Sequence, residues 1–221
     1  MTPLAALTWP QVPHPRPLLA LPLGSVEQHG PHLPLDTDTR VAVAVAAGLA
    51  ARRPDVLLAP PLAYGASGEH AGFPGTLSLG RAALEQVLLE LVRSADATAA
   101  GVLLVNGHGG NAAAVRAAAG RLAYEGRRVL AWSPPPTGDD LHAGRAETSL
   151  LLHLAPELVR LERAVAGPRP PLADLVRHGV RALSPSGVLG DPAGASAREG
   201  AALLAALVDD VTGAVAAWAA P

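Results

Sequence analysis

A short segment of this chain carries residue types that bind metal ions. Glu27 and His29 stand two positions apart, so their side chains point to the same side if the backbone is extended. Asp36 and Asp38 follow, and carboxylate and imidazole groups are ligands of Zn, Mn and Fe. The segment predicts a metal site in which Asp36 and Asp38 compete as the aspartate ligand. Asp38, at the expected start of a helix, is also a candidate for a plain helix cap.

Three further candidates lie downstream, each close to glycines that let a backbone turn or come close to a ligand. His108 lies between Gly107 and Gly109, and either binds a metal or is a hydrogen-bonded histidine in a tight turn. Glu147 is predicted to be a ligand, with a favourable charge near a helix start as the alternative. His142 is a candidate general acid or base, or a solvated loop histidine. His32 is either a plain loop residue or a partner of the ligands.

Asparagine is nearly absent from the sequence, which makes the two that occur informative. They stand at 106 and 111 and flank His108. This pairing indicates that both are needed near the histidine. Asn111 could cap the helix that follows and orient the loop.

Composition excludes several function classes. The chain has 221 residues, which suits a single domain over 1–221, and a net charge of −2, which gives no footprint for nucleic acid or a membrane surface. Its apolar runs are expected to be too short for a membrane span of about 20 residues. With no cysteine, thiol catalysis is impossible, and a reducing cytoplasm is the expected location. No phosphate-binding loop or serine-hydrolase motif occurs.

The positions of apolar residues predict an alternation of strands and helices. Short buried strands are expected at 18–24, 56–62, 101–105 and 128–132. Helices are expected at 40–53, 79–97, 112–125, 144–154 and 196–218, with Ser78 capping the second and Gly126 ending the third. The segments 133–141 and 166–195 are expected to be loops rich in Pro and Gly. This order predicts an α/β fold with a mainly parallel sheet covered on both faces.

Parallel sheets bind ligands beyond the carboxyl ends of their strands. Glu27 and His29 follow the strand 18–24, the segment 64–70 follows 56–62, and His108 follows 101–105. Three strand ends therefore bring polar residues to one edge of the sheet, as a metal-dependent hydrolase site requires.

Five motifs resemble, in order, those of the creatininase family of metal-dependent amidohydrolases. They are Leu21-Pro-Leu-Gly-Ser-Val-Glu-Gln-His-Gly-Pro-His-Leu-Pro-Leu-Asp-Thr-Asp38, Gly68-Glu-His-Ala-Gly-Phe-Pro-Gly-Thr76, Asn106-Gly-His-Gly-Gly-Asn111, His142-Ala-Gly-Arg-Ala-Glu-Thr-Ser149 and Gly187-Val-Leu-Gly-Asp-Pro192. The resemblance implies a three-layer α/β/α sandwich and one or two divalent ions (Zn, Fe or Mn). It also implies the ligands Glu27, His29, Asp38 and His108, with Asp38 bridging.

One position departs from the creatinine-cleaving members. They carry a metal-binding glutamate two residues after the histidine of the third motif, whereas this chain has Gly110. Either Glu147 supplies the missing carboxylate or the second metal site is weaker. The departure also argues against creatinine as the substrate.

Within the family, the chain is most similar to a subgroup of peptidases that act in the mycofactocin system. That likeness implies cleavage of the C-terminal portion of a short modified precursor peptide, releasing a dipeptide derived from Val and Tyr. His142 is expected to protonate the leaving nitrogen. The residues expected to contact substrate or support the ligands are Glu69, His70, Asn106 and Asn111. A homo-oligomer is also expected. The alternatives are a small-molecule amidohydrolase of the creatininase or formamide type, and a metal-binding scaffold without turnover.

Overall fold

Four parallel strands form the centre of the fold. The computed structural model describes residues 3–135, 138 and 140–219. Within them, the strand order is β2-β1-β3-β4, with β1 at Leu18–Leu23, β2 at Val56–Leu58, β3 at Gly101–Asn106 and β4 at Val129–Trp132. Strand β2 is shorter than predicted because Pro60 and Pro61 lack the N–H groups that continue a ladder. The parallel sheet expected from the sequence is confirmed.

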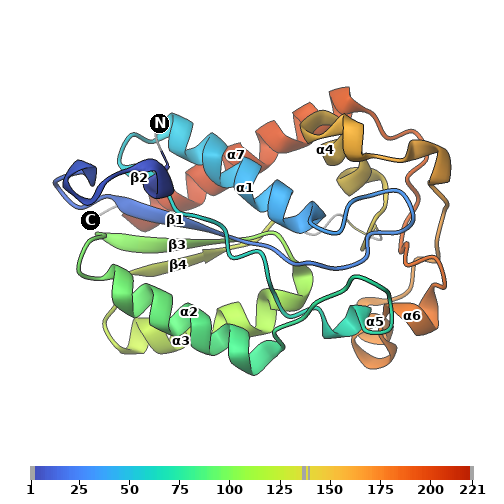
Figure 1. The fold of residues 1–221 in the computed structure, drawn as a ribbon, viewed down its shortest axis with the longest axis horizontal. Coiled ribbons are helices and arrows are strands. Elements are labelled where there is room, and N and C mark those ends of the chain that lie inside the picture. The colour runs from blue at the N-terminus through green and yellow to red at the C-terminus, as the bar shows by residue number, and fades with distance from the viewer. Residues whose placement is uncertain (1–2, 136–137, 139, 220–221) are drawn as a thin grey trace.

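Helices cover both faces of this sheet (Figure 1). One face carries α1 (Thr37–Arg52), α4 (Arg145–Leu154) and α7 (Ala197–Ala219), and the other carries α2 (Arg81–Ala95) and α3 (Ala112–Tyr124). Strand β3 alternates between them: Leu103 and Val105 join the core under α1 and α7, whereas Val102 and Leu104 join the core under α2 and α3. The three-layer α/β/α sandwich is therefore confirmed.

Two expectations about local structure were wrong. Ser78 does not cap α2. The helix follows Gly80, at φ 75°, and the Ser78 hydroxyl instead accepts hydrogen bonds from the main chain of Ser67 and Gly80. The segment 166–195 is not all loop, since it contains α5 (Leu172–His178) and α6 (Val180–Leu183).

The described 3₁₀ helices are Leu4–Ala6, Trp9–Gln11, Gly68–His70, Gly109–Asn111, Pro156–Leu158 and Leu161–Arg163. Gly126 ends α3 as predicted, at φ 76°.

Helix α7 is more apolar than the sequence analysis expected. It has 23 residues, its most apolar window has a mean hydropathy of 1.6, and 22% of that window is buried. Length and composition alone would let it cross a membrane, although apolar helices of soluble proteins meet the same criteria. In this fold α7 packs on α4 and α1, and its Asp210 accepts a 2.7 Å hydrogen bond from Trp132 Nε1. These contacts make it an outer-layer helix of the sandwich.

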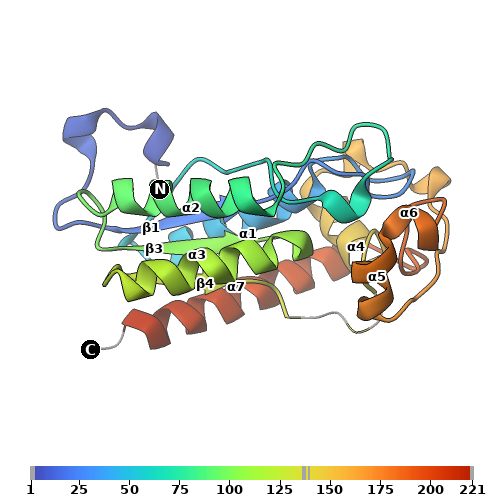
Figure 2. The same ribbon diagram turned by 90° about the horizontal axis from the view of Figure 1, so that it is seen from below.

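The carboxyl ends of all four strands face the same end of the molecule. The segments that leave β1, β2 and β3 gather there with α5 and α6 (Figures 1 and 2). This is the end at which the sequence places the candidate ligands.

Candidate active site

Glu27 and His29 lie in the segment that leaves β1, and both side chains are completely buried. Glycine at position 24 lets this segment pass against the first turn of α1, because a Cβ there would lie 2.0 Å from Thr39 Oγ1. The close approach brings the β1 segment and α1 together at one site.

Asp38 occupies the centre of the site from the first turn of α1. Its Oδ1 lies 3.1 Å from His29 Nε2, and its Oδ2 lies 3.1 Å from His108 Nδ1. The Ser25 hydroxyl also donates a 2.6 Å hydrogen bond to Oδ2 and so fixes the carboxylate. Each oxygen faces a different histidine, which is the arrangement a bridging carboxylate needs.

The two candidate aspartates differ in their surroundings. Asp36 precedes α1, is partly exposed and accepts a 2.8 Å hydrogen bond from Arg40 Nε. Asp38 is buried and joins the candidate ligands. Asp38 is also not the helix cap, since that position belongs to Asp36.

The two asparagines build the loop that carries His108. Asn106 Nδ2 donates to the main-chain oxygen of His108 at 2.8 Å, and Asn111 Nδ2 donates to Gly24 O at 3.0 Å. Asn111 Oδ1 accepts from Ala66 N at 2.8 Å, and the two side chains are joined by a 3.1 Å bond. Asn111 precedes α3 as expected, but its side chain ties together three strand ends and does not cap the helix.

Three overlapping groups of side chains present metal-ligating atoms, all within 4.8 Å of one another in each group. They are Glu27 with Glu69 and His108; His29 with Asp38 and Glu147; and Glu27 with His29 and His142. Among the described residues, neither Glu27 oxygen makes a hydrogen bond, although both are buried. An unsatisfied buried carboxylate is costly, so a cation at this position explains its presence. The nitrogen and oxygen donors fit Zn, Mn or Fe.

Without a cation the site holds protons. Burial, and then the charge of Asp38, raise the pKa of Glu27 to about 8. Burial opposes protonation of His29, but Asp38 outweighs it and raises the pKa of His29 to about 10. The opposite holds for Asp38: its pKa lies well below the ordinary value because His29 and His108 outweigh its burial. A divalent ion would take the place of these protons.

Glu147 extends from the first turn of α4 toward His29. Its Oε2 lies 3.9 Å from His29 Nε2 and accepts a 2.6 Å hydrogen bond from Ala143 N. Ala143 is held at φ 51°, a conformation that non-glycine residues rarely adopt. Burial raises the pKa of Glu147 to about 7. The turn thus positions the carboxylate on the second donor group, where the sequence expected a ligand.

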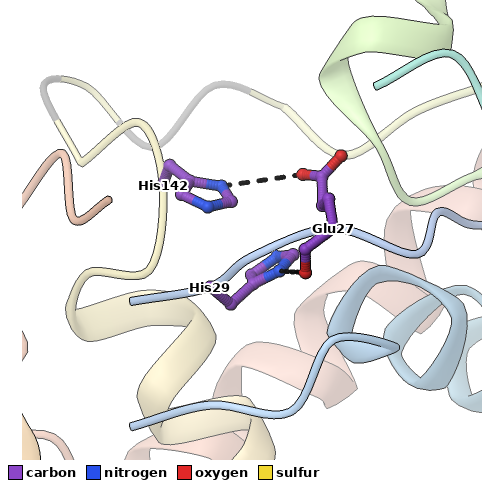
Figure 3. Close-up of side chains that lie close together, drawn as sticks. All are labelled: Glu27, His29 and His142. Carbon is purple, nitrogen blue, oxygen red and sulfur yellow. Dashed lines mark hydrogen bonds and ion pairs between the residues drawn. The ribbon is translucent and has the colours of Figure 1, made fainter. Parts of the chain in front are cut away.

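His142 lies over the same site, facing Glu27 and His29 (Figure 3). Its Nε2 donates a 2.7 Å hydrogen bond to the main-chain oxygen of Gln28, so Nδ1 is the nitrogen with the free lone pair. Nδ1 lies 3.9 Å from Glu27 Oε1. Burial, together with the nearby His29 and His70, holds the pKa of His142 well below its ordinary value. In its neutral form the ring can accept a proton at Nδ1.

Gln28 is a site residue that the sequence analysis missed. Its Nε2 donates a 2.8 Å hydrogen bond to His70 Nδ1, which leaves the proton of His70 on Nε2, 3.2 Å from Glu27 Oε1. The only signal in the sequence was the place of Gln28 between two candidate ligands. Side chains alternate in direction along an extended segment, so Gln28 would be expected to point away from them. His70 is buried, which lowers its pKa to about 4. Gln28 thus contacts both His70 and His142, and His70 lies beside Glu27 without a hydrogen bond to its carboxylate.

Glu69 lies where a side chain at position 110 would lie. A Cβ at Gly110 would be 2.1 Å from Glu69 Oε1 and 2.4 Å from His108 Nε2. The carboxylate next to Gly110 is therefore Glu69, whereas Glu147 belongs to the other donor group. Sequence analysis expected Glu69 only near the substrate or behind the ligands, because it lies far along the chain from Gly110.

His32 is buried beside α4. Its Nε2 lies 2.9 Å from the Thr148 hydroxyl, next to Glu147, and burial lowers its pKa to about 4. Of the two expectations for His32, the structure favours a partner of the ligand segment.

The chain has relatives among known protein families and curated proteins. Residues 5–215 match the family model described as creatininase, creatinine amidohydrolase. Relatives named mycofactocin precursor peptide peptidase occur in Mycobacterium ulcerans, 50% identical over 97% of this chain and 91% of the relative, and in Mycolicibacterium smegmatis, 49% identical over 91% and 85%. A creatinine amidohydrolase of Pseudomonas putida is 34% identical over 68% of this chain and 69% of that protein.

Solved structures agree with this match. A crystal structure of creatinine amidohydrolase (creatininase) has a TM-score of 0.84 and 30% identity, and covers 99% of this chain and 98% of its own. A structure named "Creatininase Mn" has a TM-score of 0.82 at 29% identity, covering 99% and 98%, and a mutant creatininase of "Zn-Zn type" has the same values. The fold is thus shared with creatininases, and the names of two of these structures mention Mn and Zn.

Proposed function

The chain belongs to the creatininase family of metal-dependent amidohydrolases, and on that premise we propose that it is a peptidase of the mycofactocin precursor peptide. Its fold is similar to that of creatinine amidohydrolase, and its donor groups could hold the metal of such a hydrolase. The proposed reaction is cleavage near the C-terminus of the short modified precursor, releasing the dipeptide derived from Val and Tyr. Identity of about half the residues to relatives of that name supports this substrate over a small molecule.

The buried, unpartnered carboxylate of Glu27 is the observation that carries the metal-dependent mechanism. One or two divalent ions would be held by Glu27, His29, Asp38, His108 and Glu147. Such ions polarise a carbonyl group and lower the pKa of water. Asp38, with one oxygen toward each histidine, is suited to join two positions.

His142 is the proposed proton carrier. Its Nε2–H is held on Gln28 O, so Nδ1 is free to take a proton from the attacking water. His142 then delivers that proton to the leaving nitrogen as the C–N bond breaks, and the ring returns to its neutral form. The lowered pKa suits this role, because the ring must begin unprotonated.

Main-chain contacts place apolar side chains along the segments that carry the ligands. Leu35 O accepts from Glu27 N at 3.0 Å, and Leu77 N donates to Val26 O at 2.8 Å. Leu35 and Leu77 are 39% and 54% exposed. Exposed leucines beside the ligands suit a peptide with apolar and aromatic side chains better than a small polar ring.

Mass spectrometry of the processed precursor peptide, incubated with and without chelator, tests this proposal. We expect the dipeptide product only when metal is present. Full occupancy by metal with no cleavage would favour a binding scaffold, and cleavage that survives complete chelation would overturn the metal-dependent mechanism.

A cytoplasmic homo-oligomer completes the proposal. The lack of cysteine fits a reducing compartment, and the oligomer follows from the family resemblance. Light scattering coupled to size-exclusion chromatography measures the oligomeric state, and a monomer at micromolar concentration would contradict it.

A further inference from the structure

We propose that Glu69 is a metal ligand, which completes one cation position with Glu27 and His108 in space that Gly110 keeps open. The inference deepens the proposed function and rests on its metal-dependent site. It assigns Glu69 to metal binding in place of a contact with substrate. It also explains why position 110 is a glycine, since a side chain there would displace the Glu69 carboxylate.

The three side chains are spaced as ligands of one ion. His108 Nε2 lies 3.1 Å from Glu27 Oε2 and 3.3 Å from Glu69 Oε1. Ligands about 2.1 Å from an ion and at right angles to each other lie about 3 Å apart. The observed spacing therefore leaves room for one cation between the three atoms.

Glu27 gives an independent reason for a cation at this position. Its side chain is completely buried, and neither carboxylate oxygen has a hydrogen-bond partner among the residues that the structure describes. Its neighbouring ring nitrogens lie at 3.1 and 3.2 Å without hydrogen-bond geometry. These contacts leave the carboxylate unsatisfied, and a shared cation would satisfy it.

Gly110 is required by the position of Glu69. A Cβ at residue 110 would lie 2.1 Å from Glu69 Oε1 and 2.4 Å from Ala66 O. Glu69 comes from the 3₁₀ helix Gly68–His70, which follows the β2 end, whereas Gly110 follows the β3 end. The carboxylate thus enters from a neighbouring strand end, and a side chain at 110 would displace it.

The other cation position does not involve Glu69. It consists of His29, Asp38 and Glu147. Loss of Glu69 should therefore weaken one position and leave the second occupied, a result that general unfolding of the site would not produce.

Metal content of the purified full chain tests this assignment without using activity. The variants are Glu69→Gln, which keeps the shape of the side chain, and Glu162→Gln, a matched control at an exposed glutamate outside the donor groups. We expect two Mn²⁺ per chain in the wild type and in the control, and one in Glu69→Gln. Titration calorimetry should show that the position formed by Glu27, Glu69 and His108 loses at least 10–100-fold in metal affinity. That is the range observed when a residue that orients a metal ligand is removed.

Electron paramagnetic resonance of the Mn²⁺-loaded chain gives a second readout. The wild type should show the coupled spectrum of paired ions, and Glu69→Gln the spectrum of an isolated ion. Gly110→Ala should give the same change with Glu69 intact, because the added methyl group displaces its carboxylate. Circular dichroism of each variant identifies any that fails to fold.

Two ions of unchanged affinity in Glu69→Gln would overturn the assignment. The assignment would also be overturned if the wild type and Glu69→Gln each bound a single ion with the same affinity. Peptide cleavage is measured separately: a wild type that binds two ions but leaves the precursor intact contradicts the proposed function and not the role of Glu69.

Discussion

The main-chain oxygen of Gln28 accepts a 2.7 Å hydrogen bond from His142 Nε2. This bond fixes which ring nitrogen of His142 carries the proton, and it links the loop after β4 to the ligand segment after β1. The neutral ring therefore presents the lone pair of Nδ1 to the site.

Replacing His142 should separate chemistry from metal binding. His142→Ala should keep both ions but lose turnover by about 10²–10⁴-fold, the usual contribution of a general acid or base. Metal analysis and steady-state kinetics on the precursor peptide measure the two effects. His178→Ala, at an exposed position on α5, is the control and should match the wild type. An unchanged kcat in His142→Ala would remove this residue from the mechanism, and loss of an ion would make it a ligand.

Asp38 and Asp36 form a matched pair for testing the bridging role. Asp38→Ala should lose both ions, because each of its oxygens faces a different histidine. Asp36→Ala should keep both, since Asp36 contacts Arg40 outside the donor groups. Metal content per chain after dialysis gives the answer. Retention of one ion by Asp38→Ala would show that the carboxylate serves a single position.

The stability of the metal-free chain should fall as the pH rises from about 7 to about 9. The pKa of Glu27 is raised to about 8 and that of His29 to about 10, so the folded chain keeps protons that the unfolded chain has released. Their stabilisation is present at low pH and is lost as the pH rises through these values. Below about pH 6.5, His32 and His70, with pKa values lowered to about 4, act in the opposite direction.

Melting temperatures with chelator and with Mn²⁺ measure this effect. Because the ion replaces the protons, the rise in Tm on adding metal should be larger at pH 9 than at pH 7. In the metal-free chain, Glu27→Gln should reduce the decline between pH 7 and 8. An equal rise in Tm at both pH values would contradict the assignment of titrating groups.

Local sequence patterns were enough to predict most of the sheet and the first ligands. Strand β3 reads as a continuous apolar run because both of its faces are buried, and its carboxyl end leads directly to His108. Glu27, His29 and Asp38 lie within one segment, so their spacing and type were visible along the chain.

Contacts between distant segments could not be predicted in the same way. The approach of Glu69 to Gly110 depends on how two loops pack, and residues 41 positions apart leave no periodic signal. His142 bonds the main-chain oxygen of Gln28. Every residue type has such an oxygen, so the sequence does not reveal this contact. Ser78 was misread as a cap because its hydroxyl bonds the loop before α2 and not the helix itself.

Asn111 should contribute to stability more than to chemistry. Asn111→Ala would leave the buried N–H of Ala66 and the oxygen of Gly24 without the bonds they now make. Each unsatisfied buried group costs about 1–3 kcal/mol, so losing both bonds should lower the free energy of unfolding by about 2–6 kcal/mol. Urea denaturation of the metal-free chain measures this change. Thr98→Ala, which removes an exposed hydroxyl that donates to Ala95 O, should change it by less than about 0.5 kcal/mol.

Creatinine should be a poor substrate, because two of the three tryptophans are held in the sandwich and do not offer an aromatic face to a small cyclic cation. Trp132 is buried and bonded to Asp210 on α7, and Trp218 packs against Arg128, whose guanidinium lies 4.9 Å from the ring centre. Both tryptophans therefore belong to the sandwich. We expect turnover of the precursor peptide and negligible hydrolysis of creatinine by the same Mn²⁺-loaded preparation. A creatininase of the same family, assayed in parallel, provides the positive control. Rapid creatinine hydrolysis with an intact peptide would instead support the small-molecule amidohydrolase.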